Sequence, residues 1–438
     1  MESTVKDLYL SNFSKLEKEI SGKDPVWLKG LRGKALAHFD EIGFPTTKNE
    51  SWKYTDLTTS LLKVPFTFET EIPAKTIALA KLKSLGFETT KVQLLVFVNG
   101  RFSPEQSGLK GLPKGVKLQS LAGILPDAEK SLGQIAPLEG RAFSALNAAY
   151  FTDGLFLSIP KGQGLSEPVH VVYLSVNSGK ATQSHLRNLL LMEDDSRATV
   201  IEHYWGDNVG ATLTNAITEV RLSKGAQLDH VKIQQESGNG YHLGSLVVKQ
   251  EEGSRLSSRI FSFGGAMARN EVETTLAGKR AECLLEGLYL AKGQQHMDTR
   301  TFVDHLSPSC RSEEVFKGVL DGEATTVFDG HVLVRENAQK TDARQSNKNL
   351  QLSKVSKVYS KPQLQIYADD VKCSHGSATG QLDEEALFYF QSRGIGRDEA
   401  KRTLVNAFAG EMVERAGLDY LKIPLNLMVG EWMENHDH

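Results

Sequence analysis

The sequence predicts a mainly β protein with helices at both ends. Apolar residues recur at helical spacing in much of residues 1–153, whereas strand-sized apolar runs separated by turns dominate residues 154–376. Residues 377–438 return to helical spacing. We therefore expect an N-terminal, mostly helical domain with some β structure, a β core and a C-terminal helical domain, with these three ranges as their limits.

A regular spacing of turns indicates how the β core is built. Short polar turns lead to Ala198, Ala226 and Ser254, which lie 28 residues apart, and similar turns lead to Ala281 and Ala324. A repeat of roughly 20 to 50 residues is typical of a solenoid, in which each coil stacks on the next. A parallel β-helix is favoured, and a β-sandwich, whose turns recur about every 8 to 12 residues, stays open. The runs expected to form strands are 169–174, 188–192, 198–203, 216–222, 228–233, 246–250 and 256–261.

The N-terminal range carries signals for helices and a hairpin. Pro25 can open a helix that Gly43 ends, because apolar residues recur every three or four positions between them. Asn99-Gly100 is a hairpin-turn dipeptide and follows a strand-like run over 92–98. The remaining expectations are helices over 75–85 and 141–150 and a loop anchored by Trp52 and Tyr54.

Two short helices are expected after the β core. Asp383 caps the first, and Gly394 ends it. Asp398 caps the second, which ends near Gly417. Their apolar residues either pack back on the β core or form a docking surface, and both interpretations stay open.

Composition excludes several classes of protein. The 438 residues have 40% hydrophobic and 24% charged content and a formal net charge of -3, without the basic excess that binding to nucleic acid requires. The first twenty residues mix both signs of charge and do not form a signal peptide, and the longest apolar runs are far shorter than the ~20 residues of a membrane span. We expect a cytoplasmic protein that binds neither nucleic acid nor membrane.

The three cysteines are too few and too scattered for a disulfide framework or a self-contained metal cluster. Cys283 lies in an apolar run and is interpreted as a structural strand residue. Cys310 lies in a polar turn, where we expect a solvent-facing thiol. The P-loop pattern is absent from the sequence, so ATP hydrolysis by that route is not expected.

Cys373 and His375 are the candidate site residues. Residues two apart in an extended chain lie on the same side, so this thiol and imidazole can share one metal ion or one proton. A β-like run ends before the pair and a helical pattern follows it, which places the pair at a boundary. Two ligands do not complete a tetrahedral site, so a metal held here needs ligands from elsewhere in the chain or from a second subunit.

Two other functions fit the same stretch. A β-helical, polysaccharide-active enzyme would use Asp369, Asp370 and Lys372, although adjacent residues of a strand face opposite ways and such enzymes are secreted. A homodimeric binding protein would leave Cys373 buried and inert.

Several stretches together carry the motifs of a known family. Residues 50–57 have the sequence ESWKYTDL, residues 96–103 have VFVNGRFS, and residues 361–376 have KPQLQIYADDVKCSHG. The match continues through SRGI at 392–395 into AFA at 407–409. With these motifs the chain resembles, over nearly its whole length, the SufB/SufD family of the SUF iron-sulfur cluster assembly machinery.

The resemblance implies both a fold and a function. It implies a right-handed parallel β-helix between N-terminal and C-terminal helical domains, acting as a scaffold subunit and not as an enzyme. The sparse cysteines are more similar to those of SufD than of SufB proteins. The β-helix would pair with SufB, and the segment from Asp383 to Arg415 would hold the SufC ATPase, while an isolated chain could form a homodimer.

The resemblance also assigns the site. A nascent iron-sulfur cluster, or iron, would lie at the interface of the two subunits, and this chain alone would hold none stably. His375 would contribute to that site as a ligand, with Cys373 beside it. ATP-driven movement of the docked ATPases would loosen a site divided between two chains.

Overall fold

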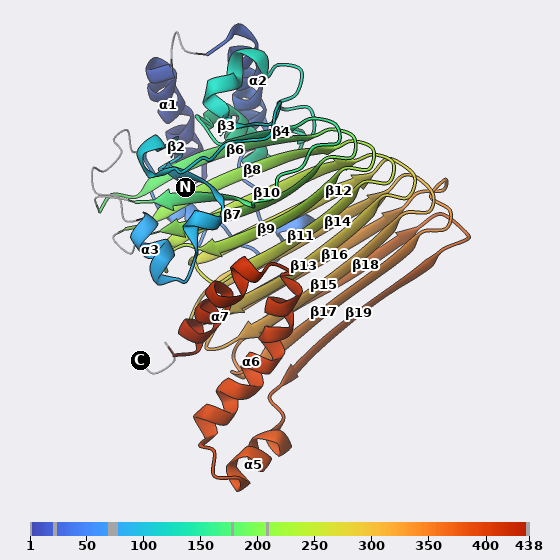
Figure 1. Cartoon of the computed structure of the whole chain (residues 1–438). Helices are drawn as coiled ribbons and strands as arrows, with labels where there is room; N and C mark the ends of the chain where they lie inside the picture. The colour runs from blue at the N-terminus through green and yellow to red at the C-terminus, as the bar shows by residue number, and fades with distance from the viewer. Residues whose placement is uncertain (1, 21–23, 69–77, 177–178, 207–209, 435–438) are drawn as a thin grey trace.

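Two parallel β-sheets form the centre of the molecule, with helices on the outer face of each (Figure 1). The structure is a computed structural model, and it describes residues 2–20, 24–68, 78–176, 179–206 and 210–434. We call the ten-stranded sheet, which contains β2 and the odd-numbered strands except β3, the odd sheet. The nine-stranded sheet, which contains β3 and the even-numbered strands from β4 to β18, is the even sheet.

The strands lengthen once the regular coils begin. The strands of the first half are β1 (Gln93–Val98), β2 (Arg101–Phe102), β3 (Lys117–Ser120), β4 (Leu155–Ile159), β5 (Val169–Ser175), β6 (Thr182–Met192), β7 (Arg197–Gly206), β8 (Thr212–Leu222), β9 (Gln227–Gln235) and β10 (Gly240–Gln250). Those of the second half are β11 (Arg255–Ser262), β12 (Met267–Leu276), β13 (Glu282–Ala291), β14 (His296–His305), β15 (Arg311–Leu320), β16 (Thr325–Val334), β17 (Asp342–Gln351), β18 (Lys357–Ile366) and β19 (Lys372–Gln381).

The chain winds as a parallel β-solenoid of about seven turns. From β4 onward, consecutive strands lie in opposite sheets, and each strand pairs in parallel with the second strand after it. A β-sandwich is therefore wrong, because its sheets are built from antiparallel neighbours. The expected β-helix and its repeat are confirmed, and the right-handed sense of the coil stays a prediction.

The solenoid is held together by columns of side chains between its sheets. Leu228 pairs in register with Ala198 on one side and with Leu256 on the other, and Leu256 pairs with Cys283. All four are buried in the same apolar core, because alternate residues of each strand point between the sheets. Cys283 is thus a structural strand residue, as expected.

Helices cover the outer faces of both sheets. On the odd sheet, Ile233 and Leu288 pack in one apolar cluster with Met412 and Trp432 from the C-terminal helices. On the even sheet, an N-terminal cluster covers Leu213, Leu243 and Met267. The helices are α1 (Glu2–Ile20), α2 (Val26–Ile42), α3 (Ala78–Ser84), α4 (Ala142–Tyr150), α5 (Glu384–Ser392), α6 (Arg397–Arg415) and α7 (Asp419–Glu434), and the short 3₁₀ turns are η1 (Glu50–Trp52), η2 (Leu61–Lys63), η3 (Thr89–Lys91), η4 (Pro104–Gln106) and η5 (Leu121–Asp127).

Most expected element limits hold. Pro25 and Gly43 flank α2, and Asn99 and Gly100 have the positive φ angles of a tight hairpin turn between β1 and β2. The start of the helix expected over 75–85 lies outside the described residues, and α3 forms the rest. The Asp383 side chain accepts hydrogen bonds from the backbone N–H groups of the first turn of α5, as a cap should.

Two expectations about local structure were wrong, and one helix was missed. Gly396, not Asp398, is the N-cap of α6, and Asp398 lies in the first turn, where its charge favours the positive helix end. Cys310 is buried rather than solvent-facing, because its turn folds back so that Sγ lies 3.2 Å from the carbonyl oxygen of Gly278. A third C-terminal helix, α7, was not expected, since Pro424 lies within it.

The domain limits stay a prediction, but the coil reaches beyond the range expected for it. The last strand runs to Gln381, past residue 376, and β1 from the N-terminal range joins the odd sheet beside β5. Within the described residues, none of the helices is long and apolar enough to span a bilayer.

Candidate functional site

The solenoid ends in two unpaired strand edges. Among the described residues, β19 pairs only with β17, and β18 only with β16. We call β18 and β19 together the coil end. Free backbone N–H and C=O groups along such edges can pair with strands of another chain.

Cys373 and His375 lie within the last strand, not at its boundary as expected. They pair in register with Ala343 and Gln345 of β17, and Ala343 belongs to the core between the sheets. Both candidate residues therefore share the inner face of β19, at the point where no further coil covers them. The structure confirms that the two side chains lie on the same side of the strand.

The two side chains have different surroundings. Cys373 is half-buried against the interior core, whereas His375 is exposed. Burial raises the pKa of the Cys373 thiol, and the nearby Asp342 carboxylate adds to that rise. The thiol must therefore lose a proton on binding a metal, while a neutral imidazole can bind directly.

The described residues do not form a complete metal site at the coil end. Within the described residues, His, Cys, Asp and Glu side chains do not gather in any group of three that could hold a metal ion. Thiol and imidazole groups are among the ligand types that iron and iron-sulfur clusters use, and a complete site with these two residues would need further ligands.

A short polar network closes the coil interior beneath the coil end. The hydroxyls of Ser377 and Ser360 lie 2.8 Å apart, and Ser360 donates to Oδ1 of Asn347 at 2.8 Å. These contacts join β19, β18 and β17 across the two sheets. The inner face of the coil end thus carries a polar network, whereas Leu364 and Cys373 on the same face pack against the apolar core.

Asp369 and Asp370 lie on an exposed corner between β18 and β19, and Lys372 is the exposed first residue of β19. Asp370 uses its backbone to join this corner to the preceding one, since its carbonyl accepts from Lys340 N and its N–H donates to Gln339 Oε1. None of the three expected enzyme residues lines the groove on the outer face of the even sheet. The structure therefore does not gather them into an enclosed active site.

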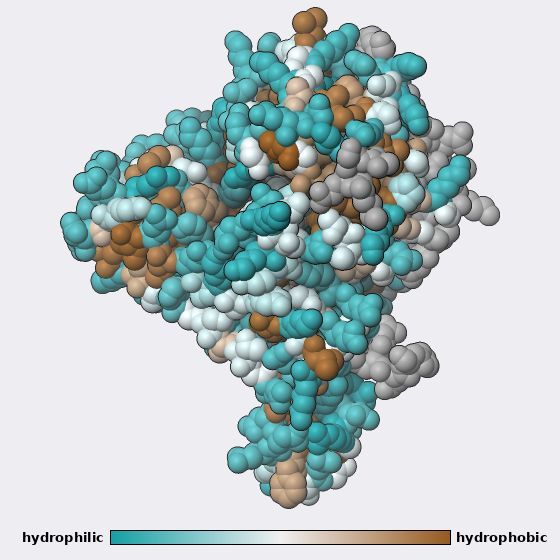
Figure 2. All heavy atoms as spheres, turned by 180° about the vertical axis from the view of Figure 1, so that it is seen from behind, coloured by the Kyte–Doolittle hydropathy of each residue, from teal (hydrophilic) through white to brown (hydrophobic). Residues whose placement is uncertain are grey.

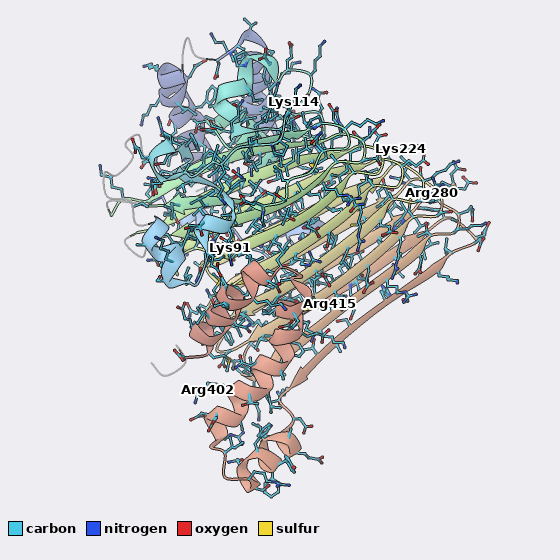
Figure 3. All side chains as sticks on the ribbon, viewed as in Figure 1. Lys91, Lys114, Lys224, Arg280, Arg402 and Arg415 are labelled. Carbon is cyan, nitrogen blue, oxygen red and sulfur yellow. The ribbon has the colours of Figure 1, made fainter. Side chains whose placement is uncertain are left out.

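The C-terminal helices form an arm that projects from the coil (Figure 1). The inner half of α6 is fixed to the odd sheet, where Arg415 pairs with Glu286 and Lys317 donates to the carbonyl oxygen of Phe408. Figure 3 shows Arg415 at the sheet and Arg402 of the same helix on the projecting part.

The tip of this arm exposes aromatic side chains. Phe388 is 72% and Tyr389 is 58% exposed on α5, although Leu387 between Ala386 and Phe388 is buried. The back view in Figure 2 shows apolar residues scattered among hydrophilic ones on the projecting part. Of the two expected helices, α6 packs back on the core with its inner half. In contrast, α5 contacts α6, where Arg397 pairs with Glu384, and leaves Phe388 and Tyr389 exposed.

One groove lies on the outer face of the even sheet. This groove of about 750 Å³ is bordered by residues of η1, the N-terminal side of α4 and strands β10 to β18. Its charges are paired across it: Arg141 with Glu273, Arg300 with Asp329, and Lys361 with Glu50. The paired charges leave no excess of one sign that would select a charged ligand.

Sequence reasoning did not find the polar residues inside the last coils. Glu314 and Gln345 are buried between the sheets, where they are joined by a hydrogen bond of 3.2 Å. The pattern of β17, DARQSNKNLQ, gave a signal, because it has polar residues at every inward position after Ala343. The sequence alone does not show which face of such a strand is buried.

Comparison with known proteins agrees with this architecture. Residues 174–408 match the family model described as SUF system FeS cluster assembly, SufBD core domain, and residues 3–171 match the SufBD protein N-terminal region. The chain belongs to the SufBD family. Membership in this family supports a role in iron-sulfur cluster assembly.

Curated relatives span nearly the whole chain. It is 30% identical to the iron-sulfur cluster assembly protein SufD of Escherichia coli over 404 residues, which cover 91% of this chain and 92% of that protein. A SufBD family protein of Synechocystis is 29% identical over 92% of this chain and 90% of its own length. The chloroplastic protein ABCI7 of Arabidopsis thaliana is 30% identical over 89% and 82%.

Proposed function

We propose that this chain is a scaffold subunit for iron-sulfur cluster assembly, without catalytic activity of its own. Its coil end pairs with a SufB-type subunit, and its C-terminal helices hold a SufC-type ATPase. The main support is the place of Cys373 and His375, which lie on the exposed inner face of the last strand, where a second coil can dock. Membership in the SufBD family supplies the chemical context.

At the coil end, the nascent cluster or iron is cargo shared by two chains. His375 is the first ligand from this side, because its imidazole is exposed. Cys373 is the second, and its raised pKa makes it the weaker ligand near neutral pH. Ligands divided between two subunits release the cluster when the subunits move apart.

The ATPase dock is the segment from Asp383 to Arg415. Its outer part presents Phe388 and Tyr389, and aromatic anchors of this kind dominate protein interfaces. Its inner part is fixed to β13 and β15, so movement of the arm is transmitted to the odd sheet. Closure of docked ATPases would therefore act on the sheet that contains Cys373 and His375.

Co-expression with SufB-type and SufC-type partners tests the proposal. We expect wild-type complexes to carry iron and sulfide after purification and His375→Ala complexes to carry several-fold less, with unchanged subunit stoichiometry. Thr379→Ala is the matched control, because Thr379 is exposed on the same inner face of β19. Equal iron and sulfide in wild type and His375→Ala would remove His375 from the site.

The same purification tests the dock. Phe388→Ala should lower the amount of co-purified ATPase without changing the SufB-type subunit, whereas Ile423→Ala, which alters another exposed apolar residue on α7, should not. Full ATPase retention by Phe388→Ala would place the dock elsewhere.

Cross-linking at Cys373 with and without nucleotide tests whether closure of the docked ATPases acts on the coil end. This coupling is refuted if the two cross-linking yields are identical.

A further inference from the structure

Three side chains on successive coils form one column inside the solenoid. Glu314 of β15 pairs in register with Gln345 of β17, and Gln345 pairs with His375 of β19. Neighbouring strands are about 4.8 Å apart, so residues in register with the same inward direction stack directly on each other. The column ends at His375, the residue to which the proposed function assigns the ligand role.

A hydrogen bond to Glu314, on the preceding coil, sets which end of the Gln345 amide faces which way. Gln345 Nε2 donates to Glu314 Oε1 at 3.2 Å, and Thr301 donates its hydroxyl to the other oxygen of that carboxyl group. Because a carboxyl oxygen accepts the bond, the –NH₂ end of the amide faces Glu314. The carbonyl end, Oε1, is left for other contacts.

The opposite sheet makes room for this amide. Gly330 of β16 faces Gln345 across the interior, and a Cβ atom at residue 330 would lie 2.2 Å from Gln345 Nε2. Real side chains do not approach so closely, so glycine is required for the amide to occupy this place. The space between the sheets is shaped around the amide group.

The carbonyl end of the amide lacks a donor. Gln345 is 3% exposed, and its Oε1 has no hydrogen-bond partner among the described residues. A buried acceptor without a donor costs about 1 to 3 kcal/mol, so the missing donor of this atom needs an explanation. The next coil along the column presents His375, whose ring can donate one N–H.

We propose that Gln345, held in place by Glu314, is the positioning residue of His375. The bond between the two side chains is not formed in the structure, where Gln345 Oε1 has no partner among the described residues. When the imidazole turns towards the coil interior, Oε1 accepts the hydrogen of one ring nitrogen, and this bond fixes the tautomer and orientation of the ring. The other ring nitrogen is then unprotonated and available as a metal ligand beyond the coil end. The inference rests on the proposed function only in naming the metal site, because the hydrogen bond itself concerns the chain alone.

Such a bond matters for the ligand role. A histidine that binds a metal usually donates its other N–H to an oxygen acceptor, and loss of that acceptor typically weakens metal binding about 10- to 100-fold. The amide oxygen suits this task because it only accepts. The buried column beneath it keeps the acceptor in place when the partner subunit leaves.

The tautomer of His375 can be measured directly. Long-range ¹H–¹⁵N spectra of the isolated, ¹⁵N-histidine-labelled chain distinguish the two neutral tautomers, and His375→Asn assigns the signal. We expect one tautomer to dominate in the wild type and the ratio to move roughly two- to tenfold towards the denatured-state ratio in Gln345→Met. Gln363→Met is the control, because that glutamine bonds Asp329 on the outer face of the coil end.

Each outcome decides the inference. An unchanged tautomer ratio in folded Gln345→Met would overturn it. If that variant does not fold, the wild-type spectrum decides, since a ratio equal to that of the same chain in denaturant also overturns it. A changed tautomer together with normal cluster content in His375→Ala would leave the hydrogen bond standing and refute the proposed ligand role.

Discussion

Cys373 and His375 are two residues apart on one strand and yet are suited to different tasks. The half-buried thiol is held largely protonated near neutral pH, because burial raises its pKa. The imidazole of His375 is exposed. The interior of the coil lies directly beneath both residues. Small residues such as Gly330 set its shape.

Replacement of Gly330 tests how tightly that interior is packed. Gly330→Ala would place a methyl group 2.2 Å from Gln345 Nε2 and 2.9 Å from the ring of Phe328. We expect a loss of about 1 to 3 kcal/mol in the free energy of unfolding, because the buried amide must move and its bond to Glu314 is strained. Urea unfolding measures the change.

Gly376→Ala provides the comparison, since a Cβ atom there meets nothing within 4 Å. Its effect should be within about 0.5 kcal/mol of zero. Equal unfolding midpoints for the two variants would show that the interior accommodates a methyl group at residue 330, and the close approach would then have no energetic meaning.

At the scale of elements, the contact between α7 and the odd sheet contains two stacked histidines. The rings of His170 and His203, on β5 and β7, lie 5.6 Å apart, and His170 Nδ1 is 2.8 Å from the hydroxyl of Tyr420 on α7. Phe87, which follows α3, contacts both rings. Burial lowers the pKa of His203 to about 4, although Gln235 and Glu236 oppose this effect.

This burial predicts a pH-dependent stability. The pKa of His203 is lower in the folded than in the unfolded chain, where it is about 6.5, so unfolding takes up a proton between these values. The stability that the folded chain gains from the neutral His203 ring is fully present above pH 6.5 and is lost as the pH falls towards 4. For His203 alone, the loss from neutral pH to pH 5 is about 2 kcal/mol.

Urea unfolding at pH 7.5 and pH 5 measures this dependence. His203→Gln should show a smaller decrease in the unfolding midpoint than the wild type, because it cannot take up the proton. His375→Gln removes an exposed histidine and should keep the wild-type decrease. A wild-type pH dependence in His203→Gln would show that the ring is not buried in its neutral form.

The elements of this fold differ in how far the sequence predicts them. Strands β5 to β11 were predicted because apolar residues, turns and a regular repeat agree locally. The burial of Cys310 and the position of α7 were not, because both depend on tertiary contacts that override a polar turn and an internal Pro424. At the site, residue spacing predicted the shared face of Cys373 and His375, whereas the column beneath them depends on the register between coils.

The whole molecule joins its two most distinctive motifs, although they are about 300 residues apart in the sequence. The stretch ESWKYTDL crosses the outer face of the even sheet, where Thr55 donates to the buried Asp298 at 2.6 Å. On the same face of the even sheet, the ring of Tyr54 stacks on that of Tyr359 of β18, with ring centroids 4.2 Å apart. The ion pair between Glu50 and Lys361 lies beside this pair of rings. The N-terminal segment thus acts as a brace for the coil end.

This brace predicts a gradient of stability along the solenoid. Each coil is stabilised mainly by its two neighbours, and β18 has a neighbouring strand only on one side among the described residues. We expect backbone amides of β18 to exchange with deuterium faster than those of β10. Tyr54→Ala should accelerate exchange in β18 about two- to tenfold, because an aromatic pair contributes about 0.5 to 1.5 kcal/mol.

Hydrogen exchange read by mass spectrometry distinguishes this brace from a passive contact. Tyr367→Ala, which removes another exposed tyrosine near the coil end, should leave exchange in β18 unchanged. Unchanged exchange of β18 in Tyr54→Ala would contradict the brace. Addition of a SufB-type partner should protect β18 and β19 and reduce the difference between Tyr54→Ala and wild type, because a docked chain supplies the missing neighbour from the other side.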